Sequence, residues 1–342
     1  MKQHLLNEIL LAGFKFSHHS PSSGYHQLAR FINSDYIDAS KFPFGDAPLG
    51  SKLKQINFML FELYLMNKTK KYKVVHYLYP EQHLIFSVPS NTKTVSVATI
   101  HLDEEWLDAK SNTNRKLATF RRKAFSQLTG IISLSSDQAS RLRDIYPNKN
   151  IKFIPHGVNE LGFYSHVDLH RQNFVITVIG SNYRDKKTFF EIVKYAQENH
   201  SNWRFNLIGV SKDWKEDASR FSNTIIHPFL QEDEYFKVLQ SSHVHLLPVE
   251  FATANNALLE AHALGVPSVV SNNSGVLDYS LKSTFHFNNV KEAIEILNYI
   301  SLLPSNEYQS LRLVTKKEAS KFYWSTVAKE VLKFYKDLGA EI

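Results

Sequence analysis

Residues 250–278 read EFATANNALLEAHALGVPSVVSNNSGVLD, and this stretch decides the fold class. Small and polar residues open a helix predicted over 256–264, so the first backbone N–H groups of that helix can hold an anion. A glycine and a proline end the helix, and residues 268–271 form a predicted buried strand. Glu260 lies about one turn into the helix, where its carboxylate can reach a sugar hydroxyl. An anion cradle beside a hydroxyl acceptor is what a nucleotide diphosphate requires.

Short apolar runs alternate with longer amphipathic segments along the whole chain. The predicted strands are 9–16, 36–39, 73–78, 95–101, 131–135, 151–155, 174–179, 205–210, 224–227, 244–247, 268–271 and 284–286. Helices are predicted between most of them, at 24–32, 53–66, 114–128, 187–199, 233–241, 256–264 and 290–303. Such alternation indicates parallel sheets covered on both faces. Twelve strands would strain one open sheet, so two doubly wound halves fit better.

Composition narrows the classes of function. The chain has 342 residues, a net charge of +7 and no cysteine, which excludes disulfides and thiolate chemistry. A basic balance suits nucleic acid, an anionic membrane or phosphate-bearing substrates, and no nucleic-acid-binding motif supports the first. Neither a signal-peptide pattern nor an apolar run long enough to span a bilayer is present. We therefore expect a cytoplasmic protein whose contact with a membrane, if it has one, is peripheral.

Further motifs accompany the opening stretch and carry a family resemblance. They are Ser23–Leu28, Val74–Tyr79, Thr99–Leu102, Phe153–Val158 and Gly180–Lys187. Together with 250–278 they closely resemble the family 4-like glycosyltransferases (glycosyl transferases group 1) of the GT-B fold. The resemblance implies an α/β protein with two Rossmann-like, doubly wound domains that face each other across a cleft. Residues 1–157 would form the acceptor domain and 158–321 the nucleotide-sugar domain, and the helix in 322–342 would cross back to the first domain.

The resemblance assigns roles to individual residues. Glu260 would hold the ribose, and the nucleotide sugar would also contact Gly24, Gly180, Phe229, Leu230, Thr253, Ala254, Asn255 and Asn256. The catalytic set would be His101, Arg184 and Lys187, in which the two cations neutralise the diphosphate leaving group and the histidine positions sugar or acceptor. Each assignment has a structural alternative: Thr253 to Asn256 could merely cap a helix, the cations could be a solvated run, and His101 could be a satisfied core histidine.

One position departs from the family pattern. The family has two glutamates separated by seven residues in this block, and counting back from Glu260 reaches Ala252. We interpret the departure as a subclass trait, although it also favours a catalytically silent partner subunit. A nucleotide-sugar epimerase is a second alternative, and a Rossmann dehydrogenase is disfavoured because no G-x-G-x-x-G follows a strand.

The resemblance implies a retaining glycosyltransferase that moves a hexose-type sugar from a UDP- or GDP-sugar to a hydroxyl of a saccharide or lipid-linked acceptor. Surface polysaccharide assembly is the expected setting. No metal is expected to be required, and Asp103–Glu105 are interpreted as a solvated helix start. A basic cluster, Arg121 to Lys123, lies on an amphipathic pattern and could contact an anionic membrane.

Overall fold

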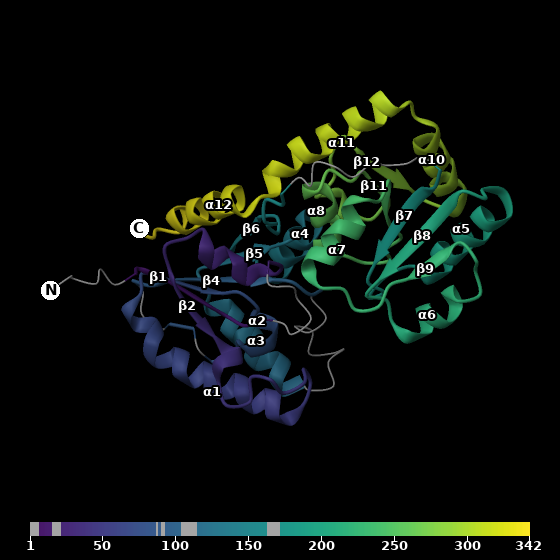
Figure 1. Ribbon diagram of the computed structural model, residues 1–342. Helices are drawn as coiled ribbons and strands as arrows, with labels where there is room; N and C mark the ends of the chain where they lie inside the picture. Colours follow the sequence, from purple (N-terminus) through teal and green to yellow (C-terminus); the bar gives the residue numbers. More distant parts are fainter. Residues whose placement is uncertain (1–6, 16–21, 87, 90–92, 104–114, 163–171) are drawn as a thin grey trace. The chain divides into compact units, whose positions relative to one another are not determined.

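The computed structural model describes residues 7–15, 22–86, 88–89, 93–103, 115–162 and 172–342. The chain divides into two compact units, and each is built on a six-stranded parallel sheet (Figure 1). The first unit contains the chain up to Gly157 together with the last helix from Trp324, and the second contains Val158–Tyr323. No helix in the described part of the chain is both long and apolar enough to cross a membrane.

The first sheet has the strand order β2-β1-β3-β4-β5-β6. Its strands are β1 Ile9–Gly13, β2 Asp35–Asp38, β3 Val74–Tyr77, β4 Val95–Ile100, β5 Gly130–Ser133 and β6 Asn150–Phe153. The helices of this unit are η1 Tyr25–Arg30, η2 Ala39–Lys41, α1 Lys52–Lys68, η3 Thr69–Lys71, α2 Pro80–His83, α3 Arg115–Gln127, α4 Ser136–Ile145 and α12 Trp324–Asp337. Every residue of β3 and β4 is buried, as expected for strands covered on both faces.

The second sheet has the order β12-β11-β10-β7-β8-β9. Its strands are β7 Phe174–Ile179, β8 Trp203–Ile208, β9 Thr224–Ile226, β10 Val244–Leu247, β11 Ser268–Ser271 and β12 Thr284–Phe287. The helices are α5 Lys186–Asn199, α6 Lys212–Ala218, α7 Glu232–Gln240, α8 Asn256–Ala263, α9 Ser274–Leu277, α10 Val290–Leu302, α11 Ser305–Ala319 and η5 Ser320–Phe322.

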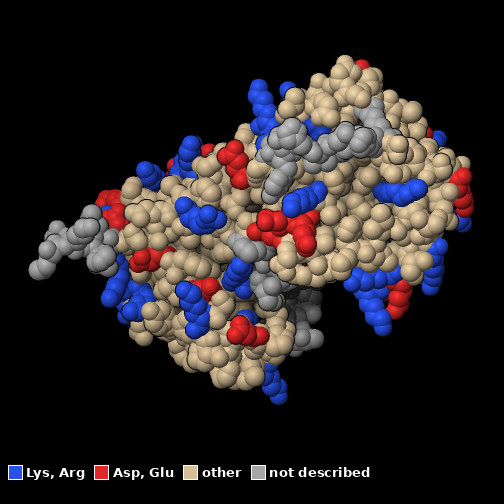
Figure 2. All heavy atoms as spheres, in the orientation of Figure 1, with Lys and Arg blue, Asp and Glu red and all other residues tan. Residues whose placement is uncertain are grey.

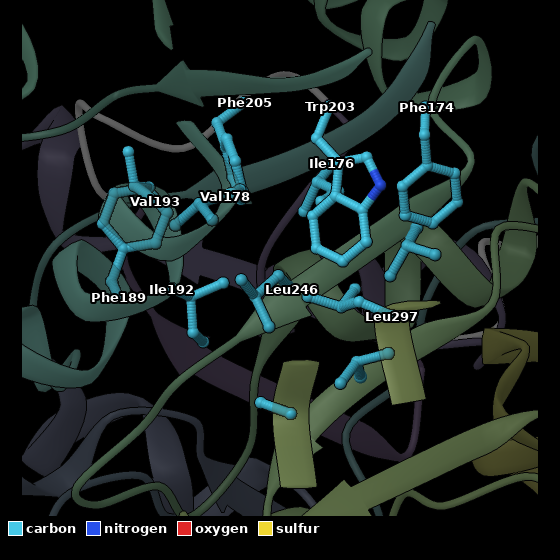
Figure 3. Close-up of a cluster of buried hydrophobic side chains, with 14 of the residues drawn as sticks. Phe174, Ile176, Val178, Phe189, Ile192, Val193, Trp203, Phe205, Leu246 and Leu297 are labelled. Carbon is cyan, nitrogen blue, oxygen red and sulfur yellow. The ribbon is translucent and has the colours of Figure 1, made fainter. Parts of the chain in front are cut away.

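One face of the second sheet packs on an aromatic core (Figure 3). Trp203 and Phe205 from β8 lie among Ile176, Val178 and Leu246 of the neighbouring strands, and all five side chains are buried. Burying such large side chains supplies most of the driving force for folding this unit.

The predicted strands are confirmed: each of the twelve described strands overlaps a predicted one. One predicted helix is different in kind. Residues 24–32 form the short 3₁₀ helix η1, whose Gln27 N–H donates to the Gly24 carbonyl at 3.1 Å. Six residues, Tyr25–Arg30, wind as 3₁₀ turns in place of the longer α-helix.

The last helix packs in the first unit. The Trp324 side chain is buried against Tyr25, with ring centroids 5.1 Å apart. The Tyr335 hydroxyl lies 2.7 Å from Nδ1 of His76 in β3. Gly157 leaves room for this helix, because a Cβ there would lie 2.2 Å from the Trp324 ring. In Figure 1 the helix, in yellow, runs beside the purple and blue strands of this unit.

Candidate active site

The loops that follow β7 and β10 lie where the strand order of the second sheet reverses. Open α/β sheets bind ligands in the crevice at such a switch point. Backbone hydrogen bonds join the two loops: the Asp185 N–H donates to the Pro248 carbonyl (3.0 Å), and the Glu250 N–H donates to the Tyr183 carbonyl (2.9 Å). Two segments that are far apart in sequence, 180–187 and 250–260, are therefore held side by side.

The second of these loops leads into α8. Asn255 is in an extended conformation and caps the helix, because its Oδ1 accepts the Leu258 N–H at 3.0 Å. The backbone at Gly275 packs closely against the loop before α8. A Cβ on Gly275 would lie 1.6 Å from the Ala252 carbonyl oxygen, so only glycine fits there. Thr253 is buried, and Ala254 and Asn256 are partly exposed. The helix start is thus rigid and lies at the switch point, where its first N–H groups can favour an anion.

Glu260 is buried in α8, like its neighbours along the helix. Its Oε2 accepts the hydroxyl of Tyr235 in α7 at 2.5 Å. Burial, followed by the charge of Glu260, raises the pKa of Tyr235 well above its ordinary value, so this hydroxyl keeps its proton and donates. Tyr235 therefore fixes the orientation of the carboxylate. A carboxylate has several lone-pair positions, so it can accept from a ligand hydroxyl as well.

Arg184 carries a partly buried positive charge in the loop after β7. Its guanidinium donates to two backbone carbonyls, those of Ile179 and Asn182, each at 3.1 Å. Within the described residues no carboxylate forms an ion pair with it, and its Nε has no hydrogen-bond partner. Burial lowers the pKa of Arg184 to about 10. An arginine in this state is still charged at neutral pH, and an anion would relieve the cost of burying it.

The lysines that follow have other surroundings. Lys186 forms ion pairs with Asp213 (2.7 Å) and Asp217 (2.8 Å) of α6. The Lys187 side chain is 87% exposed and lies 3.9 Å from Glu191, one helical turn further along α5. Since the buried side of α5 is formed by Phe189 and its helical neighbours, Lys187 lies on the opposite, outer side of the helix. Arg184 thus lies in the loop that is hydrogen-bonded to the segment before α8, whereas the Lys187 side chain lies on the outer side of α5.

Gly180 and Tyr183 shape the loop after β7. Gly180 has a φ of +69°, which glycine adopts without strain. Tyr183 has a φ of +55°, a conformation that costs a residue with a side chain about 1–3 kcal/mol. Its exposed ring lies 5.7 Å from that of Phe251, between the ring centroids. Sequence reasoning did not select this aromatic pair at the switch point, although a tyrosine in a turn that also contains glycine was a visible signal.

The segment predicted to read the base follows β9. The Phe229 side chain is 87% exposed, and Leu230 is partly exposed. The chain then enters α7, which carries the tyrosine that contacts Glu260. Exposure of a large aromatic ring here leaves one face open to a planar ligand.

In the first unit, the loops after β1, β3 and β4 meet at one edge of the sheet. Gly24 has a φ of +100° and starts η1. The next residue, Tyr25, donates its backbone N–H to the Tyr79 hydroxyl at 2.9 Å. His101 stacks on the Tyr79 ring with centroids 4.5 Å apart, and its Nε2 lies 2.6 Å from the Leu78 carbonyl. That contact requires the proton on Nε2, which fixes the tautomer of His101.

The Glu81 carboxylate anchors the loop that contains His101 by hydrogen bonds to its backbone. Its Oε1 accepts the backbone N–H groups of His101 and Leu102, the second at 3.0 Å. The carboxyl group is buried, and in the described part of the chain its Oε2 has no hydrogen-bond partner. Burial raises the pKa of Glu81 to about 7. Sequence reasoning missed this residue, although an acid directly after a buried strand and a proline was a usable signal.

Comparisons with known proteins agree on the class of enzyme. The model of the family "Glycosyl transferases group 1" matches residues 173–297, which lie in the second unit. A curated Escherichia coli relative, the UDP-Gal:alpha-D-GlcNAc-diphosphoundecaprenol alpha-1,3-galactosyltransferase, is 26% identical over 274 residues, which cover 71% of this chain and 69% of the relative.

The protein is a glycosyltransferase, and residues 173–297 carry its match to group 1.

Solved structures confirm the GT-B fold of this glycosyltransferase. A sucrose-phosphate synthase from Thermosynechococcus elongatus aligns with a TM-score of 0.70 at 14% identity, covering 98% of this chain and 90% of that one. A trehalose-phosphate synthase from Burkholderia xenovorans aligns with a TM-score of 0.68 at 10% identity, covering 96% of this chain and all of the other. At these identities the likeness concerns the fold alone.

The residues predicted for this glycosyltransferase thus fall into two groups, one in each unit. Gly180, Arg184 and residues 253–260 come together at the switch point of the second sheet, and Gly24 and His101 come together at the edge of the first. Glu104 and Glu105, interpreted as part of a solvated helix start, lie outside the described residues. Among the residues that are described, no group of three His, Asp or Glu side chains could hold a metal ion.

Proposed function

We propose that this glycosyltransferase transfers a hexose-type sugar from a UDP- or GDP-sugar to a hydroxyl of a saccharide or lipid-linked acceptor. The observation that carries the proposal is Arg184. Its partly buried cation has no carboxylate partner among the described residues, and its loop is hydrogen-bonded to the one that starts α8. A diphosphate would supply the missing negative charge, and Glu260, one turn further along α8, would accept the ribose hydroxyls.

The proposed chemistry needs few groups. The bond between the sugar C1 and the diphosphate oxygen breaks, and a bond from C1 to the acceptor oxygen forms on the same face. The acceptor proton passes to the departing phosphate oxygen, so configuration is retained. Arg184 and the first N–H groups of α8 stabilise the charge that builds up on the diphosphate, and this scheme requires no metal ion. Lys187 has no direct part in it, because its ammonium lies on the outer side of α5.

In the first unit, His101 would position the reacting sugar or the acceptor hydroxyl. Its ring is fixed by Tyr79 and the Leu78 carbonyl, and its backbone by Glu81. Such a preorganised group costs little reorganisation when the substrate binds.

The acceptor is proposed from the curated relative, whose name specifies a sugar linked to diphosphoundecaprenol. A lipid-linked acceptor of that class would place this enzyme in surface polysaccharide assembly, at the inner face of the plasma membrane. The proposal predicts that transfer to an acceptor with a long lipid chain is measurable.

Nucleotide binding by a Glu260→Ala variant tests the donor site. Charge-assisted hydrogen bonds contribute roughly 1.5–3 kcal/mol, so affinity for UDP or GDP should fall about ten- to a hundredfold in calorimetric titration. Glu295→Ala, an exposed glutamate on α10, is the matched control and should bind like the wild type. Wild-type affinity in the Glu260 variant would contradict the assignment.

One observation favours a second function. Ala252 stands where the family has its first glutamate, and its carbonyl packs tightly against Gly275. A catalytically silent subunit would bind the nucleotide without turnover until a partner protein is added. Product analysis with a nucleotide sugar and acceptor separates the cases: a transferase forms a glycosidic bond, an epimerase returns an isomerised donor, and a silent subunit gives neither.

A further inference from the structure

The outer side of α1 is unusually apolar for an exposed surface. Six large hydrophobic side chains on this helix, which we call the α1 face, are 38% to 56% exposed: Leu53, Ile56, Met59, Leu60, Leu63 and Met66. They recur at the three- and four-residue spacing of one helix side. The opposite side of α1 is already packed in the core through Phe58, Phe61 and Leu65. The helix is therefore apolar on both sides, and folding uses only one of them.

Lysines predominate in the sequence of α1 and of the turn that follows it. Between residues 52 and 73 the chain has six lysines and one acid, Glu62. Glu62 is buried, and its carboxylate accepts the backbone N–H groups of Ile85 and Phe86, so it adds no negative charge to the surface. Lys52 lies at one end of the helix, and Lys68, Lys70 and Lys71 lie at the other. Figure 2 shows the lower left part of the molecule, where Figure 1 places α1, as mostly uncharged surface with basic groups and fewer acidic groups around it.

Two further rings extend this surface. Phe86, next to the Glu62 contact, is 52% exposed, and its ring lies 5.8 Å from that of the exposed Phe120 in α3. Of the neighbouring basic residues of α3, Arg122 and Lys123 are exposed, but Arg121 is turned towards acidic groups. The Nε atom of Arg121 is buried, and this arginine interacts with Glu81 and Glu62. The membrane contact predicted for Arg121–Lys123 is therefore better placed on α1.

We propose that the α1 face inserts into the surface of an anionic lipid bilayer. Apolar side chains would enter the boundary between headgroups and acyl chains, while the flanking lysines pair with lipid phosphates. An exposed apolar surface of this extent on one helix marks an interaction site, and the lysines at both ends of the helix favour a partner with the opposite charge. The link to a lipid-linked acceptor rests on the proposed function, whereas the surface itself does not.

Vesicle sedimentation tests the proposal on the full-length protein. The wild type should sediment with vesicles of phosphatidylcholine mixed with phosphatidylglycerol, and less with phosphatidylcholine alone or at high salt. Replacing Leu53, Met59 and Leu63 with Gln should lower the partition coefficient at least roughly tenfold, since glutamine keeps the helix propensity but removes the apolar contact. Tyr299, Leu302 and Leu313, which are 56% to 73% exposed in the second unit, are replaced with Gln as the matched control and should change nothing.

The outcomes separate the candidate occupants. Loss of sedimentation with unchanged calorimetric UDP binding supports the α1 face and leaves the donor site intact. Absence of wild-type sedimentation, or equal sedimentation of the two triple variants, overturns the proposal. A wild-type dimer that the α1 variant converts to a monomer in light scattering would also overturn it, because a second copy of the chain would then cover the face. Failure of donor binding with normal sedimentation would refute the proposed function instead.

Discussion

At the scale of single residues, two ionisable groups withdrawn from solvent to different degrees define the candidate site. Arg184 keeps its charge and lacks a carboxylate among the described residues, which makes it a binding group for an anion. Glu81 has two backbone N–H donors on one oxygen and none on the other in the described part of the chain. Both lie in a loop that follows a parallel strand. Such loops lie at the edge of the sheet where ligands bind, so a polar side chain there can face a ligand.

The pH dependence of stability is a prediction for Glu81. Burial raises its pKa from an ordinary 4.5 to about 7. The folded state therefore holds this proton more tightly than the unfolded state, and its contribution to stability falls as pH rises from 4.5 towards 7. Glutamine does not ionise, so a Glu81→Gln variant does not lose stability in this way. Relative to wild type, its free energy of unfolding should increase as pH rises across that window, by at most about 3 kcal/mol.

Urea denaturation at several pH values between 4.5 and 7 measures this difference. The exposed Glu295→Gln variant provides the control and should follow the wild type at every pH. If the difference between Glu81→Gln and wild type stays constant over the window, the buried carboxyl does not titrate there.

At the scale of elements, α8 and α12 are positioned by close backbone approaches. Gly275 admits the Ala252 carbonyl beside the start of α8, and Gly157 admits the Trp324 ring at the start of α12. Neither contact can be recognised from helix periodicity, because each depends on a glycine in a separate loop. These glycines serve close packing and not a left-handed turn, since neither has a positive φ.

Gly157→Ala should destabilise the docking of α12. The new Cβ would lie 2.2 Å from the Trp324 ring, which is buried and cannot move freely. Overpacking of this kind costs about 1–3 kcal/mol in the free energy of unfolding. Gly162→Ala is the control, because a Cβ there meets nothing within 4 Å. Equal unfolding midpoints for the two variants in urea would show that α12 adjusts without cost.

At the scale of the whole molecule, the chain folds into two units with separate cores, and the last helix returns to the first of them. Two tryptophans report on the two cores. Trp324 is buried in the first unit and Trp203 in the second. A separate core allows each unit to lose stability by itself.

Hydrogen exchange should resolve the two units. Trp324→Ala is expected to cost about 3–5 kcal/mol and to speed exchange in β1 and β3–β6, while β7, β8 and α8 keep their protection. Trp203→Ala should give the reverse pattern and also weaken UDP binding, because α8 belongs to that unit. Loss of protection in both units from either variant would mean that the chain unfolds as one cooperative body.

Much of this architecture follows from the sequence alone. Buried strands are short runs of branched apolar residues, and amphipathic helices repeat every three or four residues, so local patterns sufficed to place all twelve described strands. The same patterns placed Gly180, Arg184 and residues 253–260 directly after strands, where parallel sheets bind ligands. The family resemblance then named the chemistry.

Tertiary packing alone decided which charged side chains face inward. Lys187 and Arg184 are both cations in one short segment, yet Lys187 lies on the outer side of α5 and Arg184 is partly buried and donates to the Ile179 carbonyl. The Tyr235 contact that orients Glu260 and the Glu81 carboxylate under His101 join residues from different elements. From the sequence, the apolar outer side of α1 would be predicted to be buried in the core. A local pattern records how apolar each position is, but only the packing of distant segments determines which positions lose contact with water.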